Sequence, residues 1–395
     1  MHITSLKATV QDRIDQWADE LRTLSRELHA DPELAYEEHR SATRAAGLLE
    51  RAGFKVEKGV AGLPTAFTAV VGPDDADVTV GLCLEYDALP ELGHACGHNV
   101  IAASGAGAAI GLAAVADALG IRVKAIGTPA EEGGGGKVHL LRGGAFDDVS
   151  VAMMAHPSQS DEIGSSSRAS RHFEITYQGK AAHAAAAPQL GVNAADATVV
   201  AQTALGLLRQ QLPDGIRVHG IVTEGGARNN IIPARTHMSW QLRADTLEEL
   251  DALWPRVRAC FDAGAVATGC ELEITEPAPA YAELRQDEWL TDAYAANITA
   301  RGRTPRRTAS VGASTDMGNI THVMPAIHPS IGLGCDSAPH TPGFAAAAAS
   351  PEAEKALVDV AIALAWTAVH LCVDPDQRAH VRDAHRLRVV GAARA

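Results

Sequence analysis

The sequence predicts an α/β protein with two domains: a mixed, mainly parallel sheet flanked by helices, and an inserted, ferredoxin-like α+β domain. Short apolar runs alternate with helical stretches up to about residue 168, which is the pattern of parallel strands joined by crossover helices. Residues 169–279 follow a different order, and the α/β pattern resumes after residue 280. The first domain is therefore expected to be discontinuous, over residues 1–168 and 280–395, with residues 169–279 inserted.

The first domain is expected to begin with helices and to continue with strands. Apolar residues recur at steps of three and four between residues 7 and 52, which predicts two helices broken at Asp31-Pro32. The run 77–87 is almost continuously apolar, as in a strand buried on both faces. In order, the predicted elements are strands over 65–72 and 77–87, a helix over 99–119, a strand over 122–129, a helix over 137–143 and a strand over 149–157.

The inserted domain has a β-α-β-β-α-β order of elements. They are a strand over 172–179, a helix over 193–211, strands over 216–225 and 236–244, a helix over 247–264 and a strand over 270–277. This order is typical of a ferredoxin-like fold. Residues 277–281 are the predicted linker back into the first domain, which ends in a helix over about 350–373.

Charge and composition limit the partners of this chain. The formal net charge of −14 argues against nucleic acid or an anionic membrane as a partner. The longest apolar stretch, 101–119, is rich in Ala and Gly, so a buried helix is expected rather than a membrane span. The N-terminus lacks a signal pattern, and the six cysteines are scattered without a CxxC pair. Both observations favour a cytoplasmic protein.

Polar side chains gather where the predicted strands end, which is the edge where open α/β sheets build their sites. They are Asp87, Cys96, His98, Glu131, Glu132 and His156. Thiolate and imidazole suit zinc and similar metals. By themselves, however, Cys96 and His98 could equally be a buried cysteine and a helix-capping histidine.

The pair Glu131-Glu132 precedes four glycines, Gly133–Gly136. One carboxylate of such a pair can bind a metal while its neighbour takes a proton from the metal-bound water. The alternative is a solvated acidic turn that faces the N-terminus of the next helix. The glycines lack the GxGxxG and GK[ST] patterns of phosphate-binding loops.

Two further histidines are ambiguous when taken singly. His156 ends an apolar strand and His340 lies in a proline-flanked turn, so each can be a metal ligand or a structural residue. Together with the pairs 96/98 and 131/132, they predict a hydrolytic site with one or two metal ions.

Three longer motifs carry a resemblance to a known family. EYDALPELGHACGHN (85–99), GTPAEEGGGGK (127–137) and GKAAHAAAAP (179–188) are similar to motifs of the aminoacylase and carboxypeptidase-type metallohydrolases, the twentieth metallopeptidase family. The chain most resembles the subfamily of auxin-conjugate amidohydrolases and aminobenzoyl-glutamate hydrolases, within a branch that includes β-alanyl dipeptidases. The resemblance covers nearly the whole chain, in order, including the inserted domain.

The resemblance implies a binuclear metal centre. The positions that match the metal ligands of the family are Cys96, His98, Glu132, His156 and His340. The implied cofactor is a pair of divalent ions, either Zn, Mn, Co or Ni. Glu131 matches the general base of the family, and Asp87 matches a carboxylate that orients the site.

The resemblance also implies that the inserted domain is a lid and holds a homodimer together. His183 matches a histidine that polarises the scissile carbonyl and that, in relatives, can reach the active site of the partner subunit. Asn230 and Arg243 match substrate-binding positions, and Arg243 is expected to hold a carboxylate through two hydrogen bonds. The residues alone leave open that His183 is a loop histidine and that Arg243 is a surface charge.

Two positions depart from the wider family. Glu85 stands where many members have a histidine, and Cys96 stands where many have a metal-bridging Asp. Both changes are typical of the subfamily, and they leave the identity of the metal open because a thiolate softens the site. Ser314-Thr315-Asp316 resembles a family loop near the pocket, but a structural turn is expected there.

The predicted function is hydrolysis of an amide bond in a small-molecule substrate, giving a carboxylic acid and an amine. Nothing in the motifs separates an acylase that acts on N-acyl amino acids from a dipeptidase of the β-alanyl type. A non-catalytic binding subunit of the same fold is a further alternative, although such relatives usually lose the base or a ligand.

Overall fold

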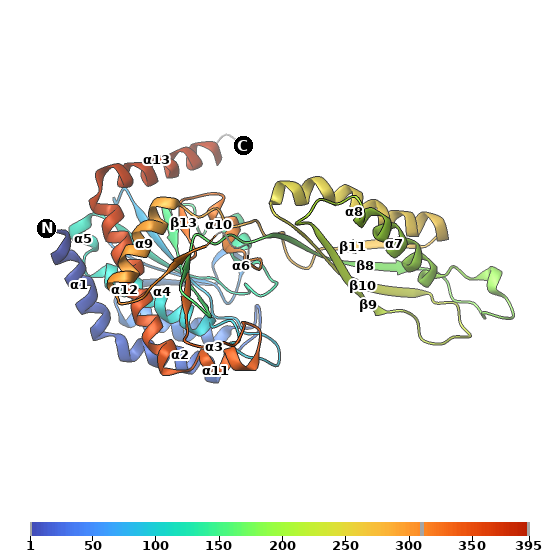
Figure 1. Ribbon diagram of the computed structural model, residues 1–395, viewed down its shortest axis with the longest axis horizontal. Helices are drawn as coiled ribbons and strands as arrows, with labels where there is room; N and C mark the ends of the chain where they lie inside the picture. The colour runs from blue at the N-terminus through green and yellow to red at the C-terminus, as the bar shows by residue number, and fades with distance from the viewer. Residues whose placement is uncertain (1, 309–311, 393–395) are drawn as a thin grey trace. The chain divides into compact units, whose positions relative to one another are not determined.

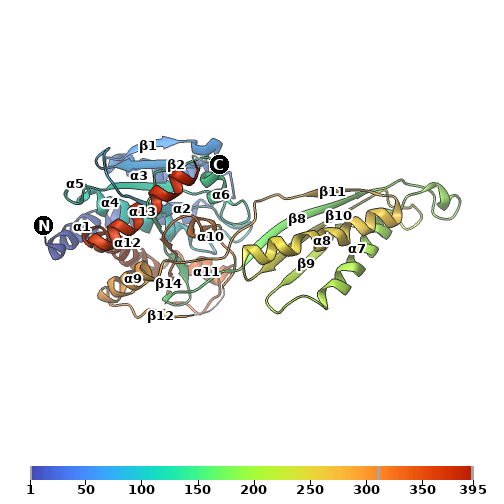
Figure 2. The same cartoon turned by 90° about the horizontal axis from the view of Figure 1, so that it is seen from above.

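The structure, a computed structural model, describes residues 2–308 and 312–392 and divides the chain into two compact units. Unit 1 comprises Met1–Ser166 and Leu284–Ala395, and unit 2 comprises Ser167–Glu283. These bounds lie within a few residues of the domain boundaries expected from the sequence. Figures 1 and 2 draw the elements of each unit with the labels used below.

Unit 1 contains a central six-stranded sheet with the strand order β1-β2-β4-β3-β5-β13. Its strands are β1 (Lys55–Lys58), β2 (Phe67–Val71), β3 (Thr79–Leu84), β4 (Arg122–Gly127), β5 (Val151–Met153) and β13 (Ala326–Ile327). Strands β4, β3, β5 and β13 are parallel to one another, whereas β1 and β2 form an antiparallel edge. The mixed, mainly parallel sheet predicted from the sequence is therefore confirmed.

Helices pack on this sheet and on one another (Figure 1). They are α1 (Ile3–Gln16), α2 (Ala18–Ala30), α3 (His39–Arg51), η1 (Val60–Gly62), α4 (His98–Ala113), α5 (Ala116–Leu119), α6 (Gly136–Arg142), α9 (Glu288–Ala300), α10 (Met317–Thr321), α11 (Pro342–Ala347), α12 (Pro351–Val373) and α13 (Pro375–Ala392). The prediction of two helices over residues 7–52 was wrong, because a second break at Trp17 (φ −103°, ψ 4°) separates α1 from α2. The apolar face continues across Trp17, so periodicity could not reveal the break.

Helix α4 is the centre of the core of unit 1, and small residues let its neighbours approach closely. A Cβ atom on Gly107 would lie 2.8 Å from Leu21 of α2 and 2.9 Å from Ala361 of α12. By length and composition, α12 could span a membrane, but 89% of its most apolar window is buried inside the protein. Such burial is typical of a core helix.

The predicted strand over residues 149–157 is in fact two strands that belong to different sheets. The chain leaves the central sheet after β5, and β6 (His156–Ser158) pairs with β14 (Ser330–Gly332). Together with β7 (Glu162–Ile163) and β12 (Arg306–Arg307), they form a small sheet of order β12-β7-β14-β6. His156 therefore begins a new strand instead of ending a long one.

Unit 2 has the predicted β-α-β-β-α-β order. Its elements are β8 (Ala169–Gln178), η2 (Pro188–Leu190), α7 (Ala194–Arg209), β9 (Arg217–Glu224), β10 (Arg235–Ala244), α8 (Leu247–Thr268) and β11 (Glu271–Thr275). The four antiparallel strands lie in the order β11-β8-β10-β9, and α7 and α8 cover one face of the sheet (Figure 2). Phe173, Trp240 and Phe261 pack edge to face between these layers.

Candidate metal centre

The polar residues singled out in the sequence meet at the carboxyl ends of the parallel strands of unit 1. From β3 the chain crosses to β4 on one side, and after β4 it crosses to β5 on the other side of β3. Open α/β sheets bind their ligands at such a point. The N-cap residue of α4, Gly97, lies there, and its backbone is left-handed (φ 74°). A Cβ atom on Gly97 would lie 2.8 Å from Pro157, so glycine lets β6 approach the start of α4.

His98 is completely buried at the centre of this cluster. Its Nδ1 atom lies 3.0 Å from Oδ1 of Asp87, and the backbone N–H of Glu132 donates to Oδ2 of the same carboxylate at 2.9 Å. Asp87 therefore ties the start of α4 to the turn that follows β4. With Nδ1 engaged, Nε2 is the ring nitrogen that His98 presents to the cluster.

The five predicted metal ligands lie close together. The ligand atoms of Cys96, His98 and Glu132 lie within 4.8 Å of one another, and so do those of Glu85, His98 and His156. Nε2 of His340 lies 3.6 Å from Oε1 of Glu132. The backbone N–H of His340 donates to the carbonyl of Ala95, which fixes its loop beside Cys96. His340 is itself left-handed (φ 64°), a strained conformation of the kind that clusters at functional sites.

The two neighbouring glutamates differ in their surroundings. Glu132 lies between His98 and His340, and its side chain is 16% exposed. The Glu131 side chain is 8% exposed, and its Oε2 atom lies 3.9 Å from Nε2 of His98. Burial, followed by the charges of Glu85, Glu132 and Asp316, raises the pKa of Glu131 well above its ordinary value. The arrangement leaves Glu131 next to the ligand cluster with a carboxylate that readily holds a proton.

The donors present fit divalent cations of borderline softness. His98 Nε2 and Glu85 Oε2 face each other at 3.4 Å, and neither forms a hydrogen bond within the part of the chain that the structure describes. Nδ1 of His156 donates to the Pro157 carbonyl at 2.7 Å, and burial lowers the pKa of His156 to about 3. His156 therefore keeps a neutral ring with a free lone pair on Nε2, which is the form that binds a metal.

A bound cation would also be stabilised by the acidic side chains of the site. Burial, followed by the charge of Glu132, raises the pKa of the Cys96 thiol far above its ordinary value, so a bound cation is needed to form the thiolate. Burial alone would lower the pKa of His98, but Asp87 raises it well above its ordinary value. A cation at Nε2 of His98 would take the place of that proton.

Sequence reasoning missed a buried ion-pair network beneath the cluster. Nζ of Lys137 donates to Glu85 at 2.5 Å and to Asp316 at 2.7 Å, and all three side chains are fully buried. Burial raises the pKa of Glu85, but Lys137 outweighs it and holds that pKa below its ordinary value. The sequence signal was a lysine directly after four glycines, at the first turn of α6. Asp316, for which a structural turn was expected, does lie in a turn at the start of α10, and its carboxylate is also a partner of this lysine.

His328 is a second residue that sequence reasoning missed. It is 8% exposed, and its ring centroid lies 5.4 Å from that of His156. The tripeptide His-Pro-Ser occurs at 156–158 and again at 328–330. Strands β6 and β14 begin at these places and pair in parallel, so the repeated tripeptide was an available signal.

The three remaining predicted residues belong to unit 2. His183 and Asn230 are both exposed and adjacent, because His183 bridges to Ile231 and the N–H of Ala184 donates to the Asn230 carbonyl. Arg243 is half-buried near the opposite end of β10 and donates to Gln241. Unit 2 therefore brings His183 and Asn230 together but not Arg243.

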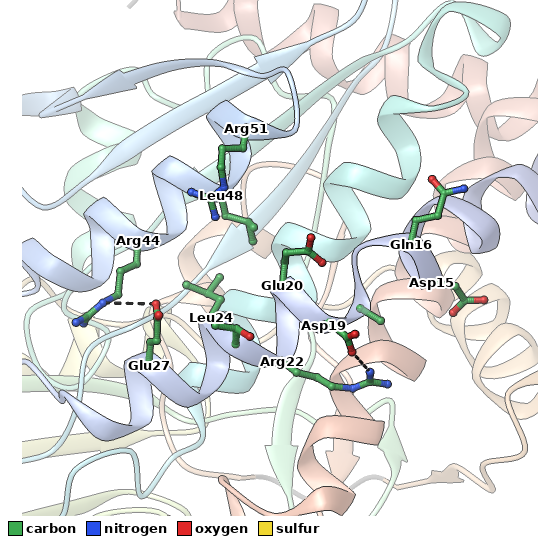
Figure 3. Close-up of a pocket in the computed structure, with 12 residues that line it drawn as sticks. Asp15, Gln16, Asp19, Glu20, Arg22, Leu24, Glu27, Arg44, Leu48 and Arg51 are labelled. Atoms are coloured by element: carbon green, nitrogen blue, oxygen red, sulfur yellow. Dashed lines mark hydrogen bonds and ion pairs between the residues drawn. The ribbon is translucent and has the colours of Figure 1, made fainter.

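A separate surface groove of about 740 Å³ lies among α1, α2 and α3. Figure 3 shows acidic and basic side chains along it, including the ion pairs of Arg22 with Asp19 and of Arg44 with Glu27. None of its lining residues belongs to the ligand cluster. Two ion pairs occupy part of its charged lining, and no group of metal-ligand atoms found among the described residues includes one of its residues.

Comparison with known proteins agrees with this geometry. Residues 81–363 match the model of a family described as peptidase family M20/M25/M40. The chain is 41% identical to the mouse Xaa-Arg dipeptidase over 94% of this chain and 90% of that protein. It is 30% identical to a p-aminobenzoyl-glutamate hydrolase polypeptide of Escherichia coli K12, over 67% of this chain and 59% of that protein. Among solved structures, the Bacillus subtilis YXEP protein, described as a dinuclear metal binding peptidase, aligns with a TM-score of 0.64 at 20% identity, over 88% of this chain and 98% of that one.

Proposed function

Because this chain belongs to the peptidase family M20/M25/M40 and is therefore a metal-dependent hydrolase of amide bonds, we propose that it is a dipeptidase. The observation that carries this proposal is the 41% identity to the mouse Xaa-Arg dipeptidase over nearly the full length of both chains. The human Xaa-Arg dipeptidase is 37% identical over 97% of this chain. We therefore take the substrate to be a dipeptide whose second residue is basic, with arginine as the first candidate.

Five side chains would hold the divalent ions: Cys96, His98, Glu132, His156 and His340. When bound, such ions lower the pKa of a water molecule and polarise the scissile carbonyl. Zn, Mn, Co and Ni all remain candidates for the site. Asp87 orients His98 through Nδ1 and the turn of Glu132 through its backbone N–H.

Glu131 is the proposed general base. Its carboxylate accepts a proton from the attacking water and then donates it to the nitrogen of the leaving amino acid, so the proton balance closes with one acid and one amine. The raised pKa of Glu131, caused first by burial, supports this role because it makes the carboxylate a stronger base toward water than an ordinary glutamate.

His183 is the proposed donor to the scissile carbonyl oxygen. The backbone N–H groups of Ala185 and Ala186 donate to its Nδ1 atom at 3.3 and 3.1 Å. In the neutral ring the proton therefore lies on Nε2, which can donate to a substrate oxygen. Asn230, beside His183, would bind the substrate, and Arg243 would hold the substrate carboxylate.

We also propose a homodimer formed through unit 2, because the two groups of substrate-binding residues lie at opposite ends of this unit. His183 and Asn230 lie beyond the Gln178 end of β8, whereas Arg243 pairs with Ser170 at the other end. Eight residues of antiparallel strand separate the ends by roughly 27 Å, which is more than a dipeptide spans. We therefore propose that His183 and Asn230 serve the active site of the partner subunit, and that Arg243 does not bind the same substrate molecule as the His183 of its own chain.

The surface of unit 2 contains apolar residues that a dimer would cover. Strand β9 is an edge strand and exposes Ile221 (64%), and α7 exposes Leu207 (66%). We expect the wild-type protein to sediment at twice 41.2 kDa and the variant Leu207→Glu/Ile221→Lys to sediment as a monomer. Val266→Glu is the matched control, since Val266 of α8 is also exposed (85%). A monomeric wild-type protein at high concentration would refute the dimer.

The function itself is tested by amine release, measured by mass spectrometry on a mixed substrate panel. The panel holds dipeptides ending in Arg, Lys, Asp or Leu, together with N-acyl amino acids and aminobenzoyl-glutamate. We expect cleavage of the Arg-terminated and Lys-terminated dipeptides, none after chelation, and recovery when manganese or zinc is returned. Faster cleavage of N-acyl amino acids or aminobenzoyl-glutamate would replace the dipeptidase proposal with the acylase alternative.

A further inference from the structure

The turn that carries Glu131 has a strained backbone. Ala130, immediately before it, is left-handed (φ 57°) although it is not a glycine. Such a conformation is unfavourable for a residue with a Cβ atom and persists only where the surroundings hold it. Within the turn, the N–H groups of Gly134 and Gly136 donate to the Ala130 carbonyl at 3.0 and 3.5 Å. Neither bond involves the N–H of Ala130, whose acceptor lies outside the turn.

The segment between α2 and α3 supplies the outside contacts. Oε1 of Glu38 accepts the N–H of Ala130 at 2.8 Å, and the hydroxyl of Tyr36 donates to the carbonyl of Gly134 at 2.7 Å. Glu38 is completely buried. Gly134 is required for this packing, since a Cβ there would lie 2.8 Å from the Tyr36 ring and 2.5 Å from Ala130. Two side chains thus hold the two ends of one turn.

The position of Glu38 in the chain makes this contact unusual. Glu38 is the N-cap residue of α3, yet its side chain makes no capping hydrogen bond to that helix. The side chain of Glu33 caps α3 instead: it accepts hydrogen bonds from the N–H groups of Arg40 at 3.2 Å and Ser41 at 2.7 Å. Because Glu33 satisfies the exposed N–H groups of the first turn, Glu38 is left to reach across to Ala130.

We propose that Glu38 is a positioning residue for Glu131: by accepting the N–H of Ala130, it holds the strained turn in the form that aims Glu131 at the metal-ligand cluster. Tyr36 assists from the other end of the turn. The proposal rests on the role proposed above for Glu131 as the base. It extends that role to two residues that lie more than 90 positions earlier in the chain.

The test compares Glu38→Ala, Glu38→Gln and Glu33→Ala in the full-length, metal-loaded protein. We expect Glu38→Ala to lower kcat by roughly 10–100-fold, the scale of a misplaced catalytic group, with KM and metal content unchanged. Glu38→Gln keeps an acceptor oxygen and should stay within a few-fold of wild type. Glu33→Ala removes buried hydrogen bonds from the same segment, so it should lower the melting temperature and leave kcat unchanged.

Hydrogen exchange of residues 128–137, read by mass spectrometry, tests the same turn without any substrate. Exchange should speed up in Glu38→Ala and stay at the wild-type rate in Glu38→Gln and Glu33→Ala. Wild-type exchange and wild-type kcat in Glu38→Ala would overturn the proposal, and so would an equal loss of kcat in Glu33→Ala. If the wild-type protein cleaved no amide at all, the proposed function would fail, and the exchange rates would still decide whether Glu38 holds the turn.

Discussion

Glu131→Gln is expected to lower kcat by roughly 10²–10⁴-fold, the usual range for loss of a general base, while the protein keeps its metal ions. The amide has nearly the shape of the carboxylate, so the turn at Ala130 should be undisturbed, but it cannot accept a proton from water. Turnover is measured on the substrates that the panel identifies, and metal content is measured by elemental analysis of the same sample.

The neighbouring variant Glu132→Gln provides the comparison. The ligand atoms of Glu132, Cys96 and His98 lie within 4.8 Å of one another, and Oε1 of Glu132 lies 3.6 Å from Nε2 of His340. Replacement of Glu132 should therefore lower metal content as well as turnover. The two variants therefore separate the proposed base from the proposed ligand at adjacent positions. Near-normal turnover in Glu131→Gln, or loss of metal in that variant alone, would show that the two roles are assigned the wrong way round.

Lys137→Met is expected to lower the free energy of unfolding of unit 1 by about 3–5 kcal/mol, the usual cost of breaking a buried ion pair. The reason is that Glu85 and Asp316 would remain buried but would lose the lysine ammonium group that both carboxylates share. The measurement is urea-dependent hydrogen exchange of peptides from unit 1, in metal-free protein. Metal binding would otherwise add its own stabilisation to the folded state.

Lys355→Met is the control for this prediction. Nζ of Lys355 also lies 2.5 Å from a carboxylate, that of Asp359, but the lysine side chain is 65% exposed. Asp359 keeps Arg301 and Arg303 as partners, so the loss should be below about 1 kcal/mol. The triple variant Lys137→Met/Glu85→Gln/Asp316→Asn should recover most of the lost stability. Equal losses of unfolding free energy in the two lysine variants would mean that the buried network stabilises the fold no more than an exposed ion pair does.

Local patterns were enough to predict the residues of the cluster and the strands that bring them together. Asp87, Cys96 and Glu132 each follow a predicted strand or open a predicted helix, and parallel strands place such residues at one edge. The pattern could not say which of Glu131 and Glu132 is the more deeply buried. That difference arises from packing around His98 and His340, which come from other parts of the chain.

What the sequence could not predict depends on contacts between distant residues. Lys137 and Asp316 are 179 positions apart, and Glu38 and Ala130 are 92 positions apart. No periodicity or motif joins such pairs, because each lies in a loop or a first helical turn whose partner is chosen by the fold. The break between β5 and β6 has the same origin, since β6 leaves the central sheet to pair with β14.

The discontinuous course of unit 1 has a consequence for its biosynthesis. Lys137 emerges from the ribosome early, but Asp316 and His340 follow only after all of unit 2 has been translated. At about 5–20 residues per second, the 179 residues between Lys137 and Asp316 delay their meeting by roughly 10–35 s. During this interval the nascent first half of unit 1 holds a lysine without its full set of partners and lacks α12 as cover for α4. Unit 2, by contrast, is one continuous segment and can fold as soon as it emerges. We therefore expect chaperones to engage the first segment of unit 1 until the last 112 residues of the chain have been translated.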